Sequence, residues 1–432
     1  MNVIVMSQEI QFSKHSTLPE PVTNNAVCFY ELDGQAFLLS FAGIDSTKEC
    51  GATHHRSFRY DLSNGEAWER IEDLPDSQIG KIGIGASQVG DLVYIVGGYT
   101  VSNNCNEVSS RRIHRYDPIQ NIYLDDGVPI PRAIDDHVQA VYKDRYIYIV
   151  TGWSNTTNVT DVQIYDTQQD IWLIGTSVPN NRDWRVFGAS GIIHGDTIYY
   201  AGGASYICST NNCFSATNWL RKGAINPADP TQIEWIGVEC TEATGYRMGV
   251  ISYQENPMWL GGSELTYNFD GIDYNESGGV SPSRKTSMYN IENQSWKITQ
   301  DRFPAVMDHR GVADARNLGA DNAGVYIIGG MLENQKVSDI VFKLQIEEDI
   351  SSVDSKLQHN LRVYPTIVKD DLFIQLEGKD QIQISGINGD IVLNKTITND
   401  ERLSMTNYES GVYFVSIILN KLSTESYRII KL

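Results

Sequence analysis

The chain has 432 residues, which is enough for two or three domains, and its composition of 41% hydrophobic and 20% charged residues excludes a disordered or membrane-embedded chain. No apolar run approaches the roughly 20 residues that a membrane-spanning helix needs. The formal net charge is −20, and residues 1–348 carry −18 of it, because the remainder holds nine Lys/Arg against eleven Asp/Glu. Such a surface repels phosphate backbones and anionic lipid, so we expect no nucleic-acid partner. Because a long apolar run is missing, we also expect no membrane span.

The first residues are unusual. Met1 to Met6 form a short apolar run that Ser7-Gln8-Glu9 follows, whereas a signal peptide has a basic start and a longer apolar stretch. We therefore expect residues 1–9 to be either the remnant of a signal peptide or a frayed terminus.

An apolar strand that closes on a glycine pair recurs along the first 348 residues. The pairs, with two degenerate copies, are Ala42-Gly43, Gly97-Gly98, Thr151-Gly152, Gly202-Gly203, Gly261-Gly262 and Gly329-Gly330. Glycine suits points where the chain leaves a strand beside crowded backbone. Six such units at regular spacing indicate a repeat architecture.

A second element follows most of these pairs: an aromatic residue, a polar turn, and a second aromatic residue seven or eight positions on. The aromatic pairs are Tyr60 and Trp68, Tyr116 and Tyr123, Tyr165 and Trp172, and Tyr289 and Trp296. Polar turns between two aromatic-rich runs predict β-hairpins.

The glycine pair and the spaced aromatic residues resemble the Kelch repeat. The resemblance implies an all-β fold, a six-bladed Kelch β-propeller over residues 10–346 with one four-stranded blade per repeat. The sixth repeat lacks its outer strand, and Ile10 to Pro19 carries the missing pattern. We therefore expect the N-terminal strand to complete the last blade, which removes an exposed sheet edge.

The pattern stops after Leu344. Residues 347–360 are polar and predict a linker, and residues 361–432 contain short strands that predict a small immunoglobulin-like β-sandwich. Another kind of small sandwich, such as a carbohydrate-binding module, is the alternative. The motifs that decide are Val363-Tyr364-Pro365, Lys369-Asp370-Asp371-Leu372, Gly386 to Val392, Ser410 to Phe414 and Arg428-Ile-Ile-Lys431.

These motifs resemble the type A sorting domain of the type IX secretion system, although Thr366-Ile367 stands where that family usually has Asn-Pro. The resemblance implies contact with the secretion machinery through this domain. It also implies that the protein is secreted or held on the outer-membrane surface of a Gram-negative bacterium.

The longest loops of the repeats follow the glycine pairs, on one face of the expected propeller. They are residues 44–55, 99–110, 204–218 and 263–285. Long loops on a rigid scaffold commonly carry function. We expect this face to bind a glycan or a protein ligand.

Cationic residues also precede the inner strands. Counting back from each glycine pair places five of them at the channel mouth on the long-loop face: Lys81, His137, Arg185, Arg247 and Arg310, with Asn25 as the sixth position. They are candidate ligand-binding residues for a carboxylate or another anion. The alternative is that they pair with the nearby Asp136, Asp183 and Asp308 to stabilise the fold.

The cysteines favour disulfides over a metal centre. Cys50 and Cys105 lie in equivalent loops of adjacent repeats and are one candidate pair, and Cys208 and Cys213 in a single loop are another. Cys28 falls in an inner strand and is expected to be a buried thiol. No metal site is expected, and no cofactor fingerprint is present.

A weaker resemblance concerns catalysis. Gly262-Ser263-Glu264 and Arg284-Lys285-Thr286 are similar to motifs of bacterial Kelch propellers that act as N-acetylneuraminate epimerases. The resemblance implies Glu264 as an acid/base and Arg284 as a carboxylate clamp. A binding protein is the favoured function, with a sialate epimerase as the alternative.

Overall fold

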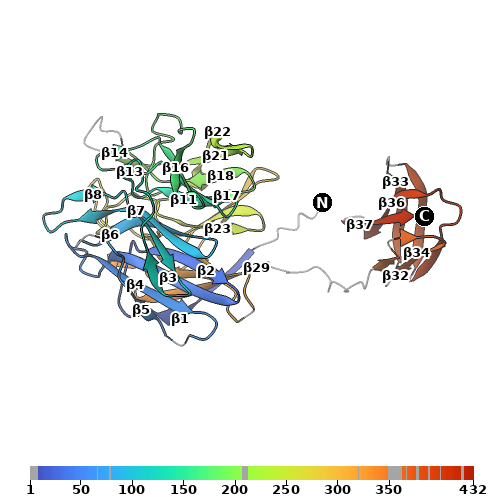
Figure 1. The fold of residues 1–432 in the computed structure, drawn as a ribbon, viewed down its shortest axis with the longest axis horizontal. Coiled ribbons are helices and arrows are strands. Elements are labelled where there is room, and N and C mark those ends of the chain that lie inside the picture. Colours follow the sequence, from blue (N-terminus) through green and yellow to red (C-terminus); the bar gives the residue numbers. More distant parts are fainter. Residues whose placement is uncertain are drawn as a thin grey trace. The chain divides into compact units, whose positions relative to one another are not determined.

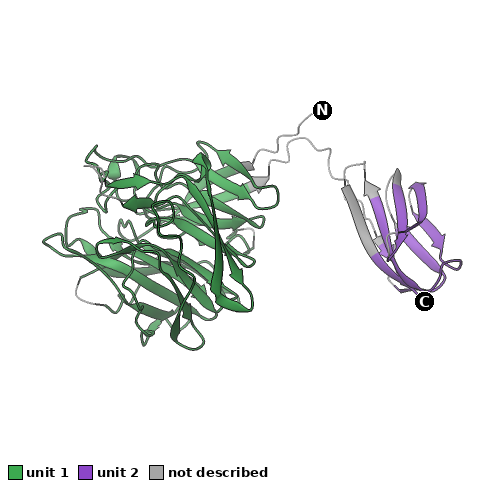
Figure 2. Ribbon diagram, turned by 90° about the horizontal axis from the view of Figure 1, so that it is seen from above, with its two compact units in different colours: residues 1–349 green, residues 350–432 purple. Residues whose placement is uncertain are grey.

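The computed structural model describes residues 8–65, 67–76, 79–206, 213–319, 321–348, 362–365, 367–375, 379–387, 390–398, 400–419 and 423–432. The chain forms two compact units, residues 1–349 and 350–432, which Figure 2 distinguishes by colour. Residues 1–7 of the predicted N-terminal remnant and 349–360 of the predicted linker lie outside the described residues.

The described part of the first unit contains six antiparallel sheets of four strands each, the second with a short fifth strand, β8 (Glu107–Ser109). From inner to outer strand, sheets one to three are β2 (Ala26–Leu32), β3 (Gln35–Ile44), β4 (Thr53–Asp61), β5 (Glu69–Ile71); β6 (Lys81–Val89), β7 (Leu92–Val101), β9 (Ile113–Asp117), β10 (Ile122–Leu124); and β11 (Val138–Tyr142), β12 (Tyr146–Val150), β15 (Val162–Asp166), β16 (Ile171–Ile174). Sheets four to six are β17 (Ser190–His194), β18 (Thr197–Ala201), β21 (Trp219–Asn226), β22 (Asp229–Glu239); β23 (Gly249–Tyr253), β24 (Asn256–Leu260), β25 (Thr286–Asn290), β26 (Ser295–Thr299); and β27 (Ala313–Asp314), β28 (Val325–Ile328), β29 (Ile340–Glu348), β1 (Gln8–Thr17).

Smaller elements lie in the loops. Two-stranded ribbons are formed by β13 (Trp153–Ser154) with β14 (Thr157–Asn158), and by β19 (Ala204–Tyr206) with β20 (Phe214–Ala216). Two short 3-10 turns, η1 (Thr241–Ala243) and η2 (Glu333–Gln335), complete the described elements of this unit.

The six sheets are arranged in a circle. Inner strands of consecutive sheets pack side by side, β2 against β6, β6 against β11, β11 against β17 and β17 against β23 (Figure 1). The inner strand of the sixth sheet, β27, contacts β2 of the first. Between sheets five and six, the His309 N–H donates to the Arg247 carbonyl at 3.1 Å. This is the β-propeller that the repeats predict.

The N-terminal strand completes the sixth sheet, as predicted. β1 pairs antiparallel with β29, with Ile10 opposite Ile346. The Ile10 side chain is 2% exposed and packs into a core with Val325 and Leu344. Strands from the two ends of the propeller sequence are thus joined in one sheet, which completes the sixth blade.

The structure explains both repeat signals. Both residues of Gly202-Gly203 have positive φ, and a Cβ on Gly202 would lie 2.1 Å from the Gly245 carbonyl oxygen of the next repeat. Across the outer hairpins, Tyr165 is the direct partner of Trp172 and their ring centroids are 5.0 Å apart. The aromatic spacing is therefore the spacing of a cross-strand pair.

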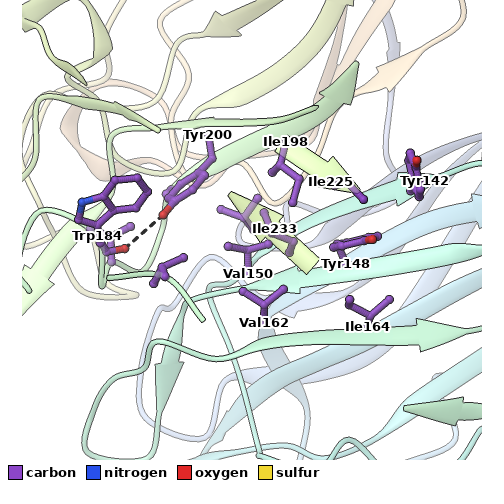
Figure 3. Close-up of a cluster of buried hydrophobic side chains, with 14 residues drawn as sticks. Tyr142, Tyr148, Val150, Val162, Ile164, Trp184, Ile198, Tyr200, Ile225 and Ile233 are labelled. Carbon is purple, nitrogen blue, oxygen red and sulfur yellow. Dashed lines mark hydrogen bonds between the residues drawn. The ribbon is translucent and has the colours of Figure 1, made fainter. Parts of the chain in front are cut away.

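Adjacent sheets are held together by apolar packing. Figure 3 shows the cluster between sheets three and four, where Tyr148 and Val162 of one sheet lie against Ile198 and Ile233 of the other. The Tyr200 hydroxyl in this cluster donates to the Trp184 carbonyl at 3.4 Å.

The second unit is a two-sheet β-sandwich. One sheet contains β30 (Arg362–Tyr364), β32 (Asp371–Gln375) and β35 (Glu401–Ser404), and the other contains β31 (Ile367–Val368), β37 (Ser423–Lys431), β36 (Gly411–Leu419), β33 (Lys379–Gly386) and β34 (Ile391–Thr398). Leu372 and Ile374 of the first sheet pack on Ile384 and Val415 of the second.

Removing the Ile10 side chain tests the closure of the circle. Ile10→Ala should lower the free energy of unfolding by about 2–5 kcal/mol, because it leaves a cavity in a packed core. Gln11→Ala, at the exposed neighbouring position, should change it by no more than about 0.5 kcal/mol. Denaturant unfolding of the full chain measures both. Equal effects of the two variants would show that β1 does not belong to the folded core.

Four histidines are buried among the described residues of the propeller, His54, His114, His137 and His309, and burial lowers the pKa of three of them. Burial lowers the pKa of His54 and of His137 to about 3, and that of His309 to about 4. The His309 Nε2–H donates to the Val306 carbonyl at 3.1 Å. These folded-state pKa values lie below the ordinary value of about 6.5, so the unfolded chain takes up protons at a higher pH than the folded chain. The stability that the neutral histidines contribute is therefore fully present above pH 6.5 and is lost as the pH falls toward 4.

The His309→Gln variant isolates one such group. Each neutral buried histidine should cost about 2 kcal/mol of stability between pH 7 and pH 5, because the unfolded chain takes up the proton. The loss over this interval should therefore be about 2 kcal/mol smaller in His309→Gln than in the wild type, and contributions from other groups cancel in the comparison. Identical losses in both proteins would mean that His309 titrates normally when folded.

Candidate functional site

Each sheet has a residue in the left-handed region of backbone conformation near the start of its inner strand. These residues, one per sheet, are Asn24, Gly83, Asp136, Gly188, Arg247 and Asp308. Backbone hydrogen bonds link them around the axis: Asp136 N–H to Gly83 O at 2.9 Å, Gly188 N–H to Asp136 O at 2.7 Å, and Arg247 N–H to Gly188 O at 2.7 Å. The Asn24 side chain continues the ring, because its Oδ1 accepts from the Gly83 N–H at 2.7 Å and its Nδ2 donates to Asp308 at 3.1 Å.

Four charged side chains of this region form what we call the axial network: Arg247, Arg310, Asp136 and Asp308. Arg247 donates to both Asp136 oxygens, at 3.2 and 2.7 Å, and to Asp308 at 2.8 Å. Arg310 lies 3.5 Å from Asp136 and donates to the His137 carbonyl at 3.0 Å. Thr23 also donates to Asp308, at 2.8 Å. Arg247 itself is 0% exposed.

The pKa values of the two carboxylates shift in opposite directions, although burial acts on both alike. Burial raises the pKa of Asp308 above its usual range even though Arg247 opposes the change. For Asp136 burial acts in the same direction, but the two guanidinium groups of Arg247 and Arg310 outweigh it and the pKa is lowered. Asp136 is therefore the firmly ionised centre of the network.

Cavities of the axial channel border the network. One, of about 80 Å³, lies among the inner strands and is lined by His137, His309 and Arg310 among others. A second, of about 50 Å³, lies on the long-loop side and is lined by Asp136 and aromatic side chains. Small-molecule sites typically occupy about 300–1,000 Å³, so neither cavity accommodates a sugar ring.

The long loop of sheet five covers the channel mouth. Its Tyr267 and Val280 are buried against Tyr246, Met307 and Met331. The Asp270 carbonyl accepts from Lys48 of sheet one at 2.9 Å, and the Val280 carbonyl accepts from Gln335 of sheet six at 2.8 Å. The insertion that the sequence places on this face is thus folded across it.

The structure brings together only some of the predicted cations. Arg247, Arg310 and His137 meet at the axis, as described above. Lys81 is 1% exposed, forms an ion pair with Asp76 and lies 3.1 Å from the Ser110 hydroxyl and 3.3 Å from His114. Arg185 is half-buried and forms no ion pair among the described residues. The ligand-binding role of these residues stays a prediction.

The cysteines follow the predicted pattern where the structure describes them. Cys50 and Cys105 form a disulfide with Cα atoms 5.0 Å apart, which confirms the predicted bridge between the loops of sheets one and two. Cys28 is a buried thiol in β2, and burial raises its pKa to about 12. Cys213 is disulfide-bonded, whereas Cys208 lies outside the described residues, so their pairing stays a prediction.

The two candidate catalytic residues are both exposed. Glu264 has a side chain that is 64% exposed and lies 3.8 Å from the Lys285 ammonium group. Arg284 is also exposed, and neither residue lines the channel cavities described above. Their chemistry stays a prediction.

A larger cleft, which sequence reasoning missed, lies beside sheet four. Its volume is about 350 Å³. The side chains that line it are largely polar and include Arg182, Asp183, Ser215, Asn218, Trp219 and Glu239. They come from the loop before β17, the ribbon β19–β20 and the facing ends of β21 and β22. The long loop 204–218 was the signal that could have located it.

A buried arginine fixes the walls of this cleft. Arg221 is 0% exposed, and its guanidinium donates to the Asp183 carbonyl at 2.5 Å, the Thr217 hydroxyl at 2.8 Å and the Trp219 carbonyl at 3.3 Å. It also lies over the Tyr200 ring, 5.0 Å from its centroid. Burial lowers the Arg221 pKa to about 10, although Tyr200 and Asp183 oppose the change. The cleft is thus built on a rigid base.

Comparisons with known proteins agree with both units. The model of the secretion system C-terminal sorting domain matches residues 362–431. Kelch-like protein 25 of Xenopus tropicalis is 27% identical over 181 residues, 38% of this chain and 28% of that protein, and Kelch-like protein 15 of Gallus gallus is 28% identical over 116 residues, 27% of this chain and 22% of that protein. The chain thus spans about a quarter of the length of these relatives.

The solved structure of YjhT superimposes with a TM-score of 0.58 at 12% identity, over 77% of this chain and 99% of that one, which supports the propeller fold. No helix in the described part of the chain is long and apolar enough to cross a membrane. The sorting domain indicates secretion from a bacterium, to the cell surface or beyond it. The chain is a Kelch-type β-propeller followed by a C-terminal sorting domain of the type IX secretion system.

Proposed function

We propose that the exported propeller is a glycan-binding protein and that its binding site is the cleft beside sheet four. The observation that supports this most strongly is the volume of about 350 Å³, which lies within the range of small-molecule sites. The channel cavities are far smaller, and the sheet-five loop covers the mouth.

The chemistry of the cleft suits sugar hydroxyl groups. Hydroxyl, amide, carboxylate and guanidinium side chains offer both donors and acceptors, and Trp219 offers an apolar ring. Two carboxylates, Asp183 and Glu239, stand against the single cation Arg182, so a neutral or amino sugar fits better than an acidic one. This argument favours a binding role over the sialate epimerase alternative.

Part of the polar lining is free to turn toward a ligand. The Arg182 side chain is 72% exposed and lies 3.4 Å from Asp183. Asn218, which is half-buried, donates to the exposed Glu239 at 3.2 Å. Binding would therefore exchange weak surface contacts for hydrogen bonds to the ligand.

Binding of the full chain to a panel of neutral, amino and acidic glycans tests the proposal. We expect a neutral or amino sugar to bind and to raise the midpoint of thermal unfolding. Arg182→Ala and Glu239→Gln should each weaken its affinity about 10-fold or more, because each removes a charge-assisted hydrogen bond worth about 1.5–3 kcal/mol.

Arg284→Ala is the matched control, since it removes an exposed arginine on sheet five and should leave the affinity unchanged. If an acidic sugar binds instead and Arg284→Ala abolishes its binding while Arg182→Ala does not, the epimerase alternative gains and the cleft proposal fails. If no glycan binds at all, the glycan proposal fails.

A further inference from the structure

The small cavity on the long-loop side of the axial network, which we call the mouth pocket, has a lining opposite to the one that the sequence predicts. Its walls include Trp153, Phe187, Phe214 and Tyr274, and its polar groups are the carboxylates of Glu107, Asp135 and Asp136. Arg247 donates to Asp136, is fully buried and is not among the residues that line the pocket. The pocket therefore presents negative charge and aromatic rings rather than cations.

Asp135 is the key residue. It is 2% exposed, and its only side-chain hydrogen bond among the described residues comes from the Ser109 hydroxyl, at 2.5 Å. No cation pairs with it in that part of the chain. Burial and the neighbouring Asp136 raise the Asp135 pKa well above its usual range. A buried carboxylate that lines a cavity with one hydroxyl as its partner is poorly compensated.

The charged groups around the mouth also favour a cation as the ligand. Around the mouth lie the four carboxylates of Glu107, Asp135, Asp136 and Asp308, and only two guanidinium groups, Arg247 and Arg310, are buried with them. Glu107 is exposed at the rim and has no ion pair among the described residues, although the protein packed around its carboxylate raises its pKa. When all four are ionised, the carboxylates outnumber the guanidinium groups by two, and burial, which raises the pKa of Asp135, Asp308 and Glu107, opposes that state. A bound cation would favour the ionised carboxylates.

The aromatic walls favour a cation as well. Phe214 stacks on Tyr274 with ring centroids 4.2 Å apart, and Trp153 lies 5.3 Å from Phe187 and 6.0 Å from Phe214. Trp153, Phe214 and Tyr274 are half-buried, so the walls border solvent. The faces of aromatic rings carry negative potential and attract ammonium groups.

Size and geometry restrict the cation. A volume of about 50 Å³ leaves room for a few water-sized groups, which suits an ammonium group and one or two methylene carbons. Among the described residues, no group of three or more His, Cys, Asp or Glu side chains is placed to hold a metal ion. A primary ammonium carries three donors, which matches several surrounding carboxylate oxygens.

We propose that the mouth pocket binds the primary ammonium group of an unbranched alkyl chain, as a lysine side chain presents it. Asp135 and Glu107 accept its hydrogen bonds, and the aromatic walls enclose its methylene groups. This site is separate from the cleft beside sheet four: β20 stands between them, with Phe214 in the pocket and Ser215 in the cleft. The proposal does not depend on glycan binding.

Isothermal titration of the full chain with Nα-acetyl-lysine amide tests the proposal. Its uncharged counterpart, Nα-acetyl-norleucine amide, and tetramethylammonium at the same ionic strength are the comparison ligands. We expect saturable binding of the lysine derivative, at least 10-fold weaker binding of the norleucine derivative, and weaker binding of tetramethylammonium, which is branched and has no N–H donor.

Two charge-removing variants locate the site. Asp135→Asn keeps the size of the side chain, and Glu107→Gln changes an exposed residue, so both should fold; each should weaken lysine-amide binding about 10-fold. Glu264→Gln removes a carboxylate at an exposed position outside the pocket and should leave binding unchanged.

Three results would overturn the proposal: no saturable binding to the wild type, equal binding of the norleucine derivative, or equal losses in Glu264→Gln and Glu107→Gln. Because Glu107 is exposed, its variant decides the matter even if Asp135→Asn proves unstable.

Discussion

Arg247 of the fifth sheet joins the third and sixth sheets at the axis of the propeller. Its side chain is fully buried, and it holds Asp136 of the third sheet and Asp308 of the sixth. A buried ion pair is stable only where the geometry is good and the remaining donors and acceptors are satisfied. Here the backbone hydrogen bonds of the left-handed residues fix the positions, and Thr23 and Asn24 complete the partners of Asp308.

This arrangement decides where a ligand can bind. The network lies at the axis, small cavities of about 80 and 50 Å³ border it in the described part of the chain, and the sheet-five loop covers the mouth. A cleft large enough for a small-molecule ligand lies beside sheet four, where Arg221 fixes the walls. The Cys50–Cys105 disulfide joins two further loops of this face. Loops that a rigid scaffold holds in place commonly carry binding sites.

The sequence predicts the repeats well because each repeat signal has a local cause. The glycine pair marks two residues of positive φ, and the aromatic spacing marks a cross-strand pair, so both are visible without knowledge of the rest of the fold. The closing strand is predictable for a similar reason, because β1 carries the pattern that the last repeat lacks.

The site is less predictable because it depends on register between repeats. Counting back from the glycine pairs selects Lys81 and Arg185, whereas the equivalent residues at the axis are Gly83 and Gly188. Aligning the repeats on residues that favour left-handed backbone, such as Asn24, Gly83 and Asp136, would have given the correct register. The path of the sheet-five loop has no such signal, since its contacts lie in sheets one and six.

The central claim is that the axial network holds the propeller together, and the Arg247→Met variant of the full chain tests it most directly. The measurement is the free energy of unfolding in denaturant, compared with Arg70→Met, which removes a half-exposed arginine from a surface pair with Asp73. Removing one partner of a buried pair should cost about 3–5 kcal/mol, because Asp136 and Asp308 lose the cation that they share and stay buried. The surface variant should cost no more than about 1 kcal/mol. A loss in Arg247→Met as small as that in Arg70→Met would contradict the account.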